Sequence, residues 1–267
     1  MAKYNFKLGD TWLSEFGAVC TEEPDMEIAQ RDVSFIDIPG KDGSDLIDNK
    51  RYKNVEFSRE IALVGRKVST ANEKAVQLIN NFAYLQGYQP FEDTEHNGMV
   101  TEAALTNFGE ISKKLRTFRT AKLNFTRKPY WYLKESLESK EVTMGTSTTL
   151  INPYPATACP TIILMINTSP YSTDTSVNIT INVSSTYEGV YSTKNYAIKN
   201  AVANYNYPYI VIDIENQCVF SRNDNGEKYK FSDSDVPMPI GPGKTEITIS
   251  RNGHVKQAWI IPNWRCL

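Results

Sequence analysis

The fold is decided in the stretch Asp32-Val33-Ser34-Phe35-Ile36-Asp37-Ile38-Pro39-Gly40-Lys41-Asp42-Gly43, an apolar strand that runs into two glycine-containing turns. Side chains of a strand alternate between its two faces, so Phe35 points to one face and Ile36 to the other. Pro39 sets the backbone angle before a turn, and Gly40 and Gly43 accept positive φ without steric cost. The stretch therefore predicts the first half of a hairpin with a charged, glycine-hinged tip.

The return strand of this hairpin is expected over residues 52–60, which follow the sequence Asp48-Asn49-Lys50-Arg51. Arg31, Lys41 and Arg51 place charge along the hairpin, where it can meet a neighbouring chain. A strand pair that projects past its sheet also offers unpaired backbone groups that a neighbour can extend. Nothing in the hairpin is typical of a catalytic site.

The overall composition indicates a β-rich protein of two domains. The chain has 267 residues and 30.2 kDa, which is enough for two ordinary domains. The 29 basic and 31 acidic side chains leave a formal net charge of −2, which argues against affinity based on phosphate neutralisation. Tyrosine and threonine are plentiful, and both favour strands. A change of composition over 133–140 places the boundary so that the domains are 1–136 and 137–267.

The opening residues Met1 to Lys7 lack the apolar core of a secretory signal, and no run approaches the roughly 20 apolar residues of a spanning helix. We therefore expect a chain that is made in a cytoplasm and is not inserted in a membrane. No metal site and no cofactor are expected, because the cysteines are far apart and form no CxxC pair. They are Cys20, Cys159, Cys218 and Cys266.

Residues 69–85 are predicted to form a helix that covers one face of a sheet. Thr70 and Glu73 have the spacing of a capping box, and Gly87 follows where a left-handed residue commonly ends a helix. The apolar stripe expected to face the sheet consists of Ala75, Val76, Ile79, Phe82, Ala83 and Leu85.

Two further segments of the first half allow more than one interpretation. Residues 91–98 hold three acids beside His96, which suits a divalent metal or acid–base chemistry. They lie in one contiguous loop, which favours an exposed acidic turn. Residues 113–125 form a basic strand with interleaved apolar residues, which suits a solvated face, a surface that meets neighbouring subunits, or single-stranded nucleic acid.

The second half predicts a β-sandwich of short strands separated by turns. Residues 177–183 alternate strictly between apolar and polar, which puts one face in a core. The proline-rich segments 153–155 and 237–243 cannot continue a central strand and are expected to be loops. The remaining strands are expected at 141–143, 148–151, 161–166, 209–214, 218–220, 228–231, 244–249 and 257–261.

The chain resembles the distal tail protein (Dit) family of long-tailed bacteriophages. The resemblance rests on Arg31-Asp32, on Ile38-Pro39-Gly40-Lys41-Asp42-Gly43 and on Tyr52-Lys53-Asn54-Val55. It extends to the block Phe125 to Tyr132, in which Arg127 stands where many relatives have cysteine, and to weaker pieces such as Ile240-Gly241-Pro242-Gly243. It implies a mainly β fold whose first domain is a β-sandwich or split-barrel-like domain with one helix and a long hairpin. The second domain is then a galectin-like sandwich.

The same resemblance implies a structural protein of the virion tail tip, or baseplate, that is assembled in the host cytoplasm. Six copies close head-to-tail into a ring through the first domain, and DNA passes through the channel without specific binding. The implied partners are the major tail protein, a tail-associated lysin or tail fibre protein, and receptor-binding proteins. The expected subunit-contact residues are Arg31, Asp32, Pro39, Gly40, Lys41, Asp42, Gly43, Arg51, Tyr52 and Asn54.

Two other functions were weighed against this structural role. An enzyme is not expected: Asp213 and Glu215 lie two apart on one predicted strand, whereas paired catalytic carboxylates normally face each other across a cleft. A carbohydrate-binding module that contacts the host surface is the alternative, because aromatic side chains can stack on sugars. Its candidate residues, which could equally contact a protein partner, are Tyr205, Tyr207, Tyr209, Trp259 and Trp264.

Overall fold

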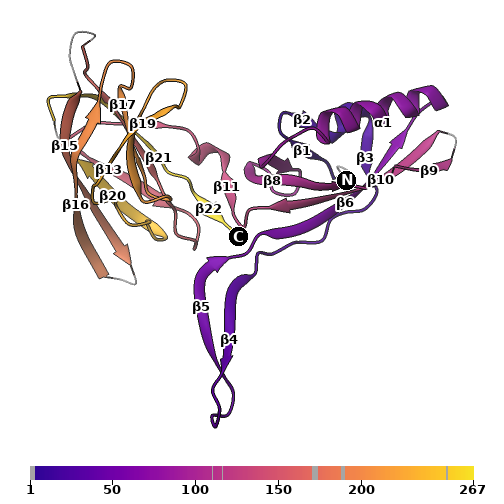
Figure 1. Ribbon diagram of the computed structural model, residues 1–267, viewed down its shortest axis with the longest axis horizontal. Coiled ribbons are helices and arrows are strands. Elements are labelled where there is room, and N and C mark those ends of the chain that lie inside the picture. Colours follow the sequence, from indigo (N-terminus) through magenta and orange to yellow (C-terminus); the bar gives the residue numbers. More distant parts are fainter. Residues whose placement is uncertain (1–3, 110, 116, 170–173, 188–189, 251) are drawn as a thin grey trace. The chain divides into compact units, whose positions relative to one another are not determined.

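A computed structural model describes residues 4–109, 111–115, 117–169, 174–187, 190–250 and 252–267, and Figure 1 shows its ribbon. The chain is mainly β and forms two compact units. One unit runs from Met1 to Trp131 and includes Leu267, and the other runs from Tyr132 to Cys266. The mainly β fold in two parts is confirmed. Independent folding of 1–136 and 137–267 stays a prediction.

The first unit is built on one large antiparallel sheet. Its strands follow the order β2-β1-β7-β8-β10-β6-β3, and β9 pairs with β10. The strands are β1 (Phe6–Leu8), β2 (Thr11–Trp12), β3 (Ala18–Cys20), β6 (Val55–Val64), β7 (Gln89–Asp93), β8 (Met99–Phe108), β9 (Ser112–Leu115) and β10 (Phe118–Arg127). A short 3-10 helix, η1 (Leu13–Phe16), lies between β2 and β3. The basic segment predicted as one strand over 113–125 is thus a hairpin of β9 and β10.

Packed phenylalanine rings form the core of this unit. Phe57 of β6 and Phe125 of β10 stack with centroids 5.0 Å apart, because cross-strand partners on one face of a sheet lie close together. Phe6 and Phe91 stack at 5.6 Å on the neighbouring strands. Phe82, at the end of helix α1, lies 6.2 Å from Phe6. This helix therefore closes the core over the sheet, as the sequence predicted.

Helix α1 (Val68–Phe82) differs from its prediction in its start and its buried face. Its N-cap is Lys67, with no side-chain cap, so the predicted capping box of Thr70 and Glu73 is wrong. The entry is set instead by close packing: a Cβ on Gly65 would lie 2.5 Å from the backbone nitrogen of Ala71. Val76 of the predicted stripe is exposed. The buried stripe is Ala71, Ala75, Leu78 and Phe82.

Strands β4 (Arg31–Asp37) and β5 (Ser44–Tyr52) pair with each other and, within the described residues, with no third strand. Figure 1 shows this ribbon extending away from the sheet of its own unit. Gly40 and Gly43 both have positive φ, 83° and 78°, as the turn requires. The predicted return strand over 52–60 is wrong, because the chain reverses directly after Gly43. Residues 55–64 are instead β6, which belongs to the sheet.

The second unit is a sandwich of two sheets. One sheet has the order β12-β21-β14-β17-β18-β19 and the other β13-β20-β15-β16. The strands are β12 (Lys140–Val142), β13 (Ser147–Asn152), β14 (Thr161–Ile166), β15 (Thr175–Tyr187), β16 (Val190–Ala203), β17 (Tyr209–Asp213), β18 (Cys218–Arg222), β19 (Lys228–Ser232), β20 (Gly243–Ile249) and β21 (Val255–Ile261). The unit also contains η2 (Lys134–Ser136) and β22 (Arg265–Cys266), and β11 (Trp131–Leu133) spans the division between the units.

Residues from both sheets meet in the core of the sandwich. Ile162 and Ile212 come from the six-stranded sheet, and Ile181 and Ile247 from the four-stranded sheet. The predicted strands of this half are confirmed within a few residues at each end. Strand β16 was not predicted, because its polar and apolar residues do not alternate strictly.

The described residues can be compared with three features that were expected to be absent. No helix among these residues is long and apolar enough to cross a membrane. No group of three or more acidic, histidine or cysteine side chains there could hold a metal ion. No disulfide joins the cysteines of the described residues, which are Cys20, Cys159, Cys218 and Cys266.

Candidate interface on the projecting hairpin

The base of the β4–β5 ribbon is held by a carboxylate. Asp32 is buried, and Arg51 donates from Nε to its Oδ2 at 2.6 Å. The Lys53 amine lies 3.6 Å from Oδ1 of the same group. The hydrogen bond from Arg51 lowers the pKa of Asp32, so this carboxylate stays charged. Two of the predicted contact residues, Asp32 and Arg51, thus bind each other across the ribbon.

The chain enters the ribbon through an extended segment that two arginines hold on the sheet. Arg59 of β6 is buried and donates to both carboxylate oxygens of Glu27, at 2.6 and 3.2 Å. Arg127 of β10 is also buried and donates to the backbone oxygen of Glu27 at 2.8 Å. Bidentate arginine–carboxylate pairs fix orientation as well as position. The direction in which β4 leaves the sheet is therefore constrained by these two side chains.

The roles of Arg59 and Arg127 were not predicted from the sequence, in which Arg127 stood out only as a departure from the cysteine of many relatives. A signal for both was present in the alternation: Arg59 shares a strand face with the buried Phe57 and Ile61, and Arg127 with Phe125. An arginine on an inward face must find acceptors, because burying an unpaired charge is costly. Glu27 is the acceptor in both cases.

Arg59 is the centre of a larger buried network. Its Nε donates to the Tyr4 hydroxyl at 3.0 Å, and that hydroxyl donates to Asp93 at 3.3 Å. Burial raises the pKa of Tyr4, so the phenol keeps its proton. Burial also acts to raise the pKa of Asp93, but hydrogen bonds from the His96 side chain and backbone outweigh it and hold that pKa below the ordinary value. The network links the ribbon's entry beside β6 to Asp93 at the end of β7.

The sequence predicts that the acidic segment 91–98 is an exposed turn, but part of this segment is buried. Asp93 is buried and accepts from Nδ1 of His96 at 2.9 Å. The His96 ring stacks on Trp131, with centroids 4.0 Å apart. The reason is long-range: β7 pairs with β1, which brings Asp93 beside Tyr4. The arrangement serves the fold and forms no metal site among the described residues.

Both broad faces of the ribbon expose apolar side chains. Phe35 lies directly opposite Leu46, and their side chains are 69% and 59% exposed. On the other face Ile36 and Ile47 are 48% and 45% exposed. We call these the Phe35 face (Phe35 and Leu46) and the Ile36 face (Ile36 and Ile47). A solvated two-stranded ribbon normally carries polar side chains on at least one face.

The charges of the ribbon pair with each other. Arg31 contacts Asp48 at 2.7 Å, Lys41 pairs with Asp45, and Ser44 donates to Asp37 at 2.5 Å. Residues 31–53 contain five acidic and five basic side chains, so the ribbon has no net charge. Arg31, Lys41 and Arg51 were expected to offer charge to a neighbour, but each has a partner within the ribbon. The exposed apolar side chains are therefore its main distinguishing feature.

The other predicted contact residues lie at the two ends of the ribbon. The tip residues Pro39, Gly40, Asp42 and Gly43 are exposed. At the base, Tyr52 packs edge-on against Tyr130 with centroids 5.9 Å apart, and Asn54 donates to the Tyr88 hydroxyl at 2.7 Å. These contacts lie within the first unit. Whether the residues also contact another chain stays a prediction.

Comparison with solved structures extends over almost the whole chain. The crystal structure of the Dit protein of phage SPP1 matches with a TM-score of 0.65 and 13% identity, covering 99% of this chain and 99% of that one. That protein is described as a paradigm of the hub adsorption apparatus in phages that infect Gram-positive bacteria.

The chain has the Dit fold.

Two chains from phage p2 baseplate structures, with Ca and with Sr, also match, at TM-scores of 0.47 and 0.48. Each is 10% identical and covers 96% of both chains. No protein-family model and no curated protein matches the sequence. The resemblance to the Dit family, which rests on the hairpin and on the Pro129-Tyr130 block, is confirmed for the fold. The comparisons by sequence did not detect it.

Within the Dit fold, the aromatic residues proposed for sugar or partner contact do not form one site. Trp264 is buried in the sandwich core, which removes it from the surface and corrects that expectation. Trp259 and Tyr209 pack on the opposite face of the six-stranded sheet, around the buried Phe220. Tyr207 stacks on Tyr229 with centroids 4.7 Å apart. Tyr205 alone of the five is largely exposed.

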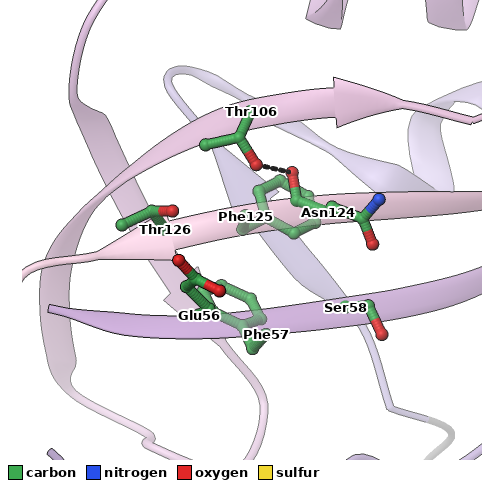
Figure 2. A pocket seen from close by; sticks show the side chains of 7 residues that line it. All are labelled: Glu56, Phe57, Ser58, Thr106, Asn124, Phe125 and Thr126. Atoms are coloured by element: carbon green, nitrogen blue, oxygen red, sulfur yellow. Dashed lines mark hydrogen bonds between the residues drawn. The ribbon is translucent and has the colours of Figure 1, made fainter.

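One recess of the first unit is open to solvent and is lined by residues of β6, β8 and β10. Figure 2 shows the side chains that line it. Its volume is about 410 Å³. Glu56 and Ser58 of β6, Thr106 of β8 and Asn124 and Thr126 of β10 line it. Thr106 donates to the backbone oxygen of Asn124 at 3.1 Å. Hydroxyl and amide groups with one carboxylate supply no nucleophile–base pair, so the recess is not typical of an active site.

The paired carboxylates of the second unit do not make a catalytic site either. Asp213 ends β17 and accepts from the side chain of Asn216 at 2.8 Å. Glu215 lies in the following turn and pairs with Arg265 at 3.0 Å. The two carboxylates thus have separate structural partners.

Proposed function

We propose that this chain is a structural distal tail protein of a bacteriophage, located at the virion tail tip. The observation that carries the proposal is the shared fold with the SPP1 protein over 99% of both chains. A match of such extent with a hub protein favours a structural role over catalysis. Fold alone does not establish function, so the role needs a direct test.

The finer part of the proposal is a closed ring of six copies. Six copies of the 30.2 kDa chain have a mass of 181.2 kDa (6 × 30.2). A head-to-tail contact between identical chains makes a ring when its rotation closes. The ribbon supports such a contact because it leaves its own sheet and exposes apolar side chains. Six is the number that the resemblance to the Dit family implies.

The ring would join the tail tube to the tail tip. Its proposed partners are the major tail protein on one side and a tail-associated lysin or tail fibre protein on the other, with receptor-binding proteins at the second unit. A central channel of about 20 Å would let duplex DNA pass. The outer sheet face around Glu56, Ser58 and Asn124 suits such a lining, because a strongly basic wall would hold the phosphates.

Cryo-electron microscopy of the tail tip tests this proposal. We expect a ring of this chain whose open channel is lined by residues before 132. A closed lumen, or a channel lined by the second unit, would contradict the role. Absence of the chain from the tail tip would overturn it entirely.

Sugar binding is the second candidate, and one observation favours it. Tyr205 is 58% exposed beside the stacked pair of Tyr207 and Tyr229, so an aromatic face is available on the surface of the second unit. A glycan array would show binding that Tyr205→Ala abolishes if this unit recognises sugars. If the protein binds no glycan, only the structural role remains as a candidate.

A further inference from the structure

We propose that the open edge of strand β16 binds an extended segment of another tail-tip protein by strand addition, at the backbone of Thr193 and Asn195. This inference rests on the proposed function, which places partner proteins at the second unit. It adds the place of binding, the mode of binding and the chemistry of the bound segment. That segment carries an acidic side chain that faces Lys194.

Strand β16 is the last strand of the four-stranded sheet, so one of its long edges has no strand beside it within the described residues (Figure 1). The segment 232–235 covers one part of that edge. The backbone of Asp235 donates to the oxygen of Ala197 at 3.3 Å, and the Ser232 hydroxyl donates to the oxygen of Lys199 at 2.9 Å. The part of the edge that precedes Ala197 has no such cover from the described residues.

The covering segment leaves β16 at two prolines. Pro237 and Pro239 have no N–H group, so the segment cannot continue as a ladder along the edge. Ile240 then exchanges two backbone hydrogen bonds with Ala158, both at 2.9 Å. The sequence therefore ends the cover at a defined place and leaves the remaining edge of β16 open.

The backbone groups of Thr193 and Asn195 point to the open edge. Successive residues of an antiparallel pair direct their N–H and C=O groups alternately toward the partner strand and away from it. Ala197 points away from β15, since its oxygen accepts from the covering segment, and Thr180, which lies opposite it, accepts from the backbone of Ser250 instead. Asn195 and Thr193 lie two and four residues back along the same regular ladder. Each therefore offers a donor and an acceptor to a further strand.

A recess of about 370 Å³ lies on the inward face of the sheet at this edge. Val183, Tyr196 and Ile240 give it apolar walls. Lys194 lines it as well, and its amine lies 3.7 Å from the sulfur of Met238. Side chains of a strand alternate between its two faces, so every second side chain of an added strand is directed to the face that carries this recess. Apolar side chains at those positions fit its walls.

Lys194 determines which strand can be added. Among the described residues no carboxylate pairs with its amine. An inward-pointing charge on an edge strand is a barrier to pairing between identical edges. If two copies of this chain paired with Thr193 opposite Asn195, their Lys194 side chains would lie opposite each other, which is unfavourable. A segment with Asp or Glu at that position is favoured instead, so the occupant that fits is a different polypeptide.

Peptide selection on the immobilised full chain provides the first test. The probe is a yeast-displayed library of random peptides of about ten residues, which is the length of a long strand. We expect the enriched peptides to share one acidic residue with apolar residues two positions before or after it, because these three side chains lie on one face of a strand. The tightest peptide is then synthesised, and its affinity is measured by titration calorimetry.

Asn195→Pro is the variant that tests strand addition. It removes an outward N–H group and leaves the ladder with β15 intact, since an edge strand tolerates proline where its nitrogen faces solvent. The affinity for the peptide should fall by about tenfold or more. Asn195→Ala is the matched control, because it keeps the N–H group, and it should bind like the wild type. Circular dichroism melts check that both variants keep the wild-type fold.

Lys194→Glu tests the chemistry of the segment. This variant should lose affinity for the acidic peptide and should prefer a peptide in which lysine replaces the acid. Equal affinity of the variant for the two peptides would contradict the inference. The inference is also wrong if the library yields no peptide that binds, or if Asn195→Pro binds as tightly as Asn195→Ala.

A map of the tail tip separates this inference from the proposed function. Density for an extended segment of another protein along Thr193 and Asn195 supports it. A bare edge, or an edge covered by a second copy of this chain, overturns it and leaves the proposed function in place. Absence of the chain from the tail tip overturns the proposed function and, with it, the identity of the partner as a tail-tip protein.

Discussion

Two long antiparallel ribbons in this molecule use their apolar residues in opposite ways. The β15–β16 ribbon joins β20 in a sheet, and its inward side chains Val177, Ile179 and Ile181 are buried in the sandwich core. The β4–β5 ribbon has no third strand among the described residues, and Phe35 and Ile36 are exposed on opposite faces. Strict alternation puts all apolar side chains on one face, which a single chain can bury. Apolar residues on both faces of a lone ribbon cannot be buried by the ribbon itself.

The comparison is tested most directly by the same substitution in both ribbons. Ile181→Ala should lower the free energy of unfolding of the second unit by about 2–5 kcal/mol, because it leaves a cavity in a packed core. Ile36→Ala should change the stability of the first unit by no more than about 0.5 kcal/mol, because the side chain is half exposed. Denaturant unfolding of the full chain measures both. Equal losses would show that the β4–β5 ribbon is part of a folded core.

Fragments of the second unit sharpen the comparison, since the β15–β16 ribbon should keep its core without the first unit. The backbone of Leu133 donates to Trp264, and Ser136 accepts from Asn263 and from Trp264. A fragment of 137–267 loses these three hydrogen bonds. We expect it to be about 2–4 kcal/mol less stable than a fragment of 132–267.

Circular dichroism melts of the two fragments provide the measurement. Both should melt cooperatively if the second unit is a domain in its own right. If the longer fragment shows no cooperative melt, the two units form one folding domain. Equal stability of the two fragments would place the boundary after residue 136, as the sequence predicts.

A carboxylate in the large sheet and one in the β4–β5 ribbon should contribute differently to the pH dependence of stability. The pKa of Asp93 is lower in the folded protein than the ordinary value near 4, so the charged form stabilises the fold above about pH 4. That contribution is lost as the pH falls through the folded pKa. Asp93→Asn should lower the free energy of unfolding by about 1–3 kcal/mol at pH 7. The stability of this variant should also decline less steeply as the pH falls.

Asp45→Asn is the matched control, because Asp45 pairs with Lys41 on the exposed ribbon. Surface ion pairs contribute about 0–1 kcal/mol, so this variant should follow the wild-type curve. Thermal melts between about pH 2.5 and pH 7 compare the three proteins. A wild-type curve that shows no decline below pH 4 would contradict the role given to Asp93.

The smallest effect on stability is expected at the ribbon's tip. Gly40→Val with Gly43→Val strains two residues with positive φ, at about 1–2 kcal/mol each, but the strain stays in a ribbon outside the core. The free energy of unfolding of the first unit should fall by less than about 1 kcal/mol. Negative-stain microscopy of the assembled protein should show loss of rings.

Gly226→Val provides the control for the tip variant. Gly226 also has positive φ, 85°, and open space around it, but it lies between β18 and β19 in the second unit. It should leave the rings intact. Normal rings from the Gly40 and Gly43 variant would remove the ribbon from the proposed contact.

Local features of the sequence determined much of the architecture. Alternation at 177–183 predicted a half-buried strand, the helical stripe predicted α1, and Pro39 with Gly40 and Gly43 predicted the hairpin's turn. These signals are readable because each depends on residues that are neighbours in the chain. The motifs of the hairpin also led to the Dit fold.

Tertiary structure alone decided where distant residues meet. The burial of Asp93 depends on the pairing of β7 with β1, about 85 residues away, and Arg59 reaches Glu27 only because β6 lies beside the entry segment. Trp264 was expected on the surface but lies in the core of the sandwich. Strand partners are chosen by long-range packing, which no local pattern encodes. The two exposed faces of the ribbon became visible only when β5, and not β6, proved to be its partner.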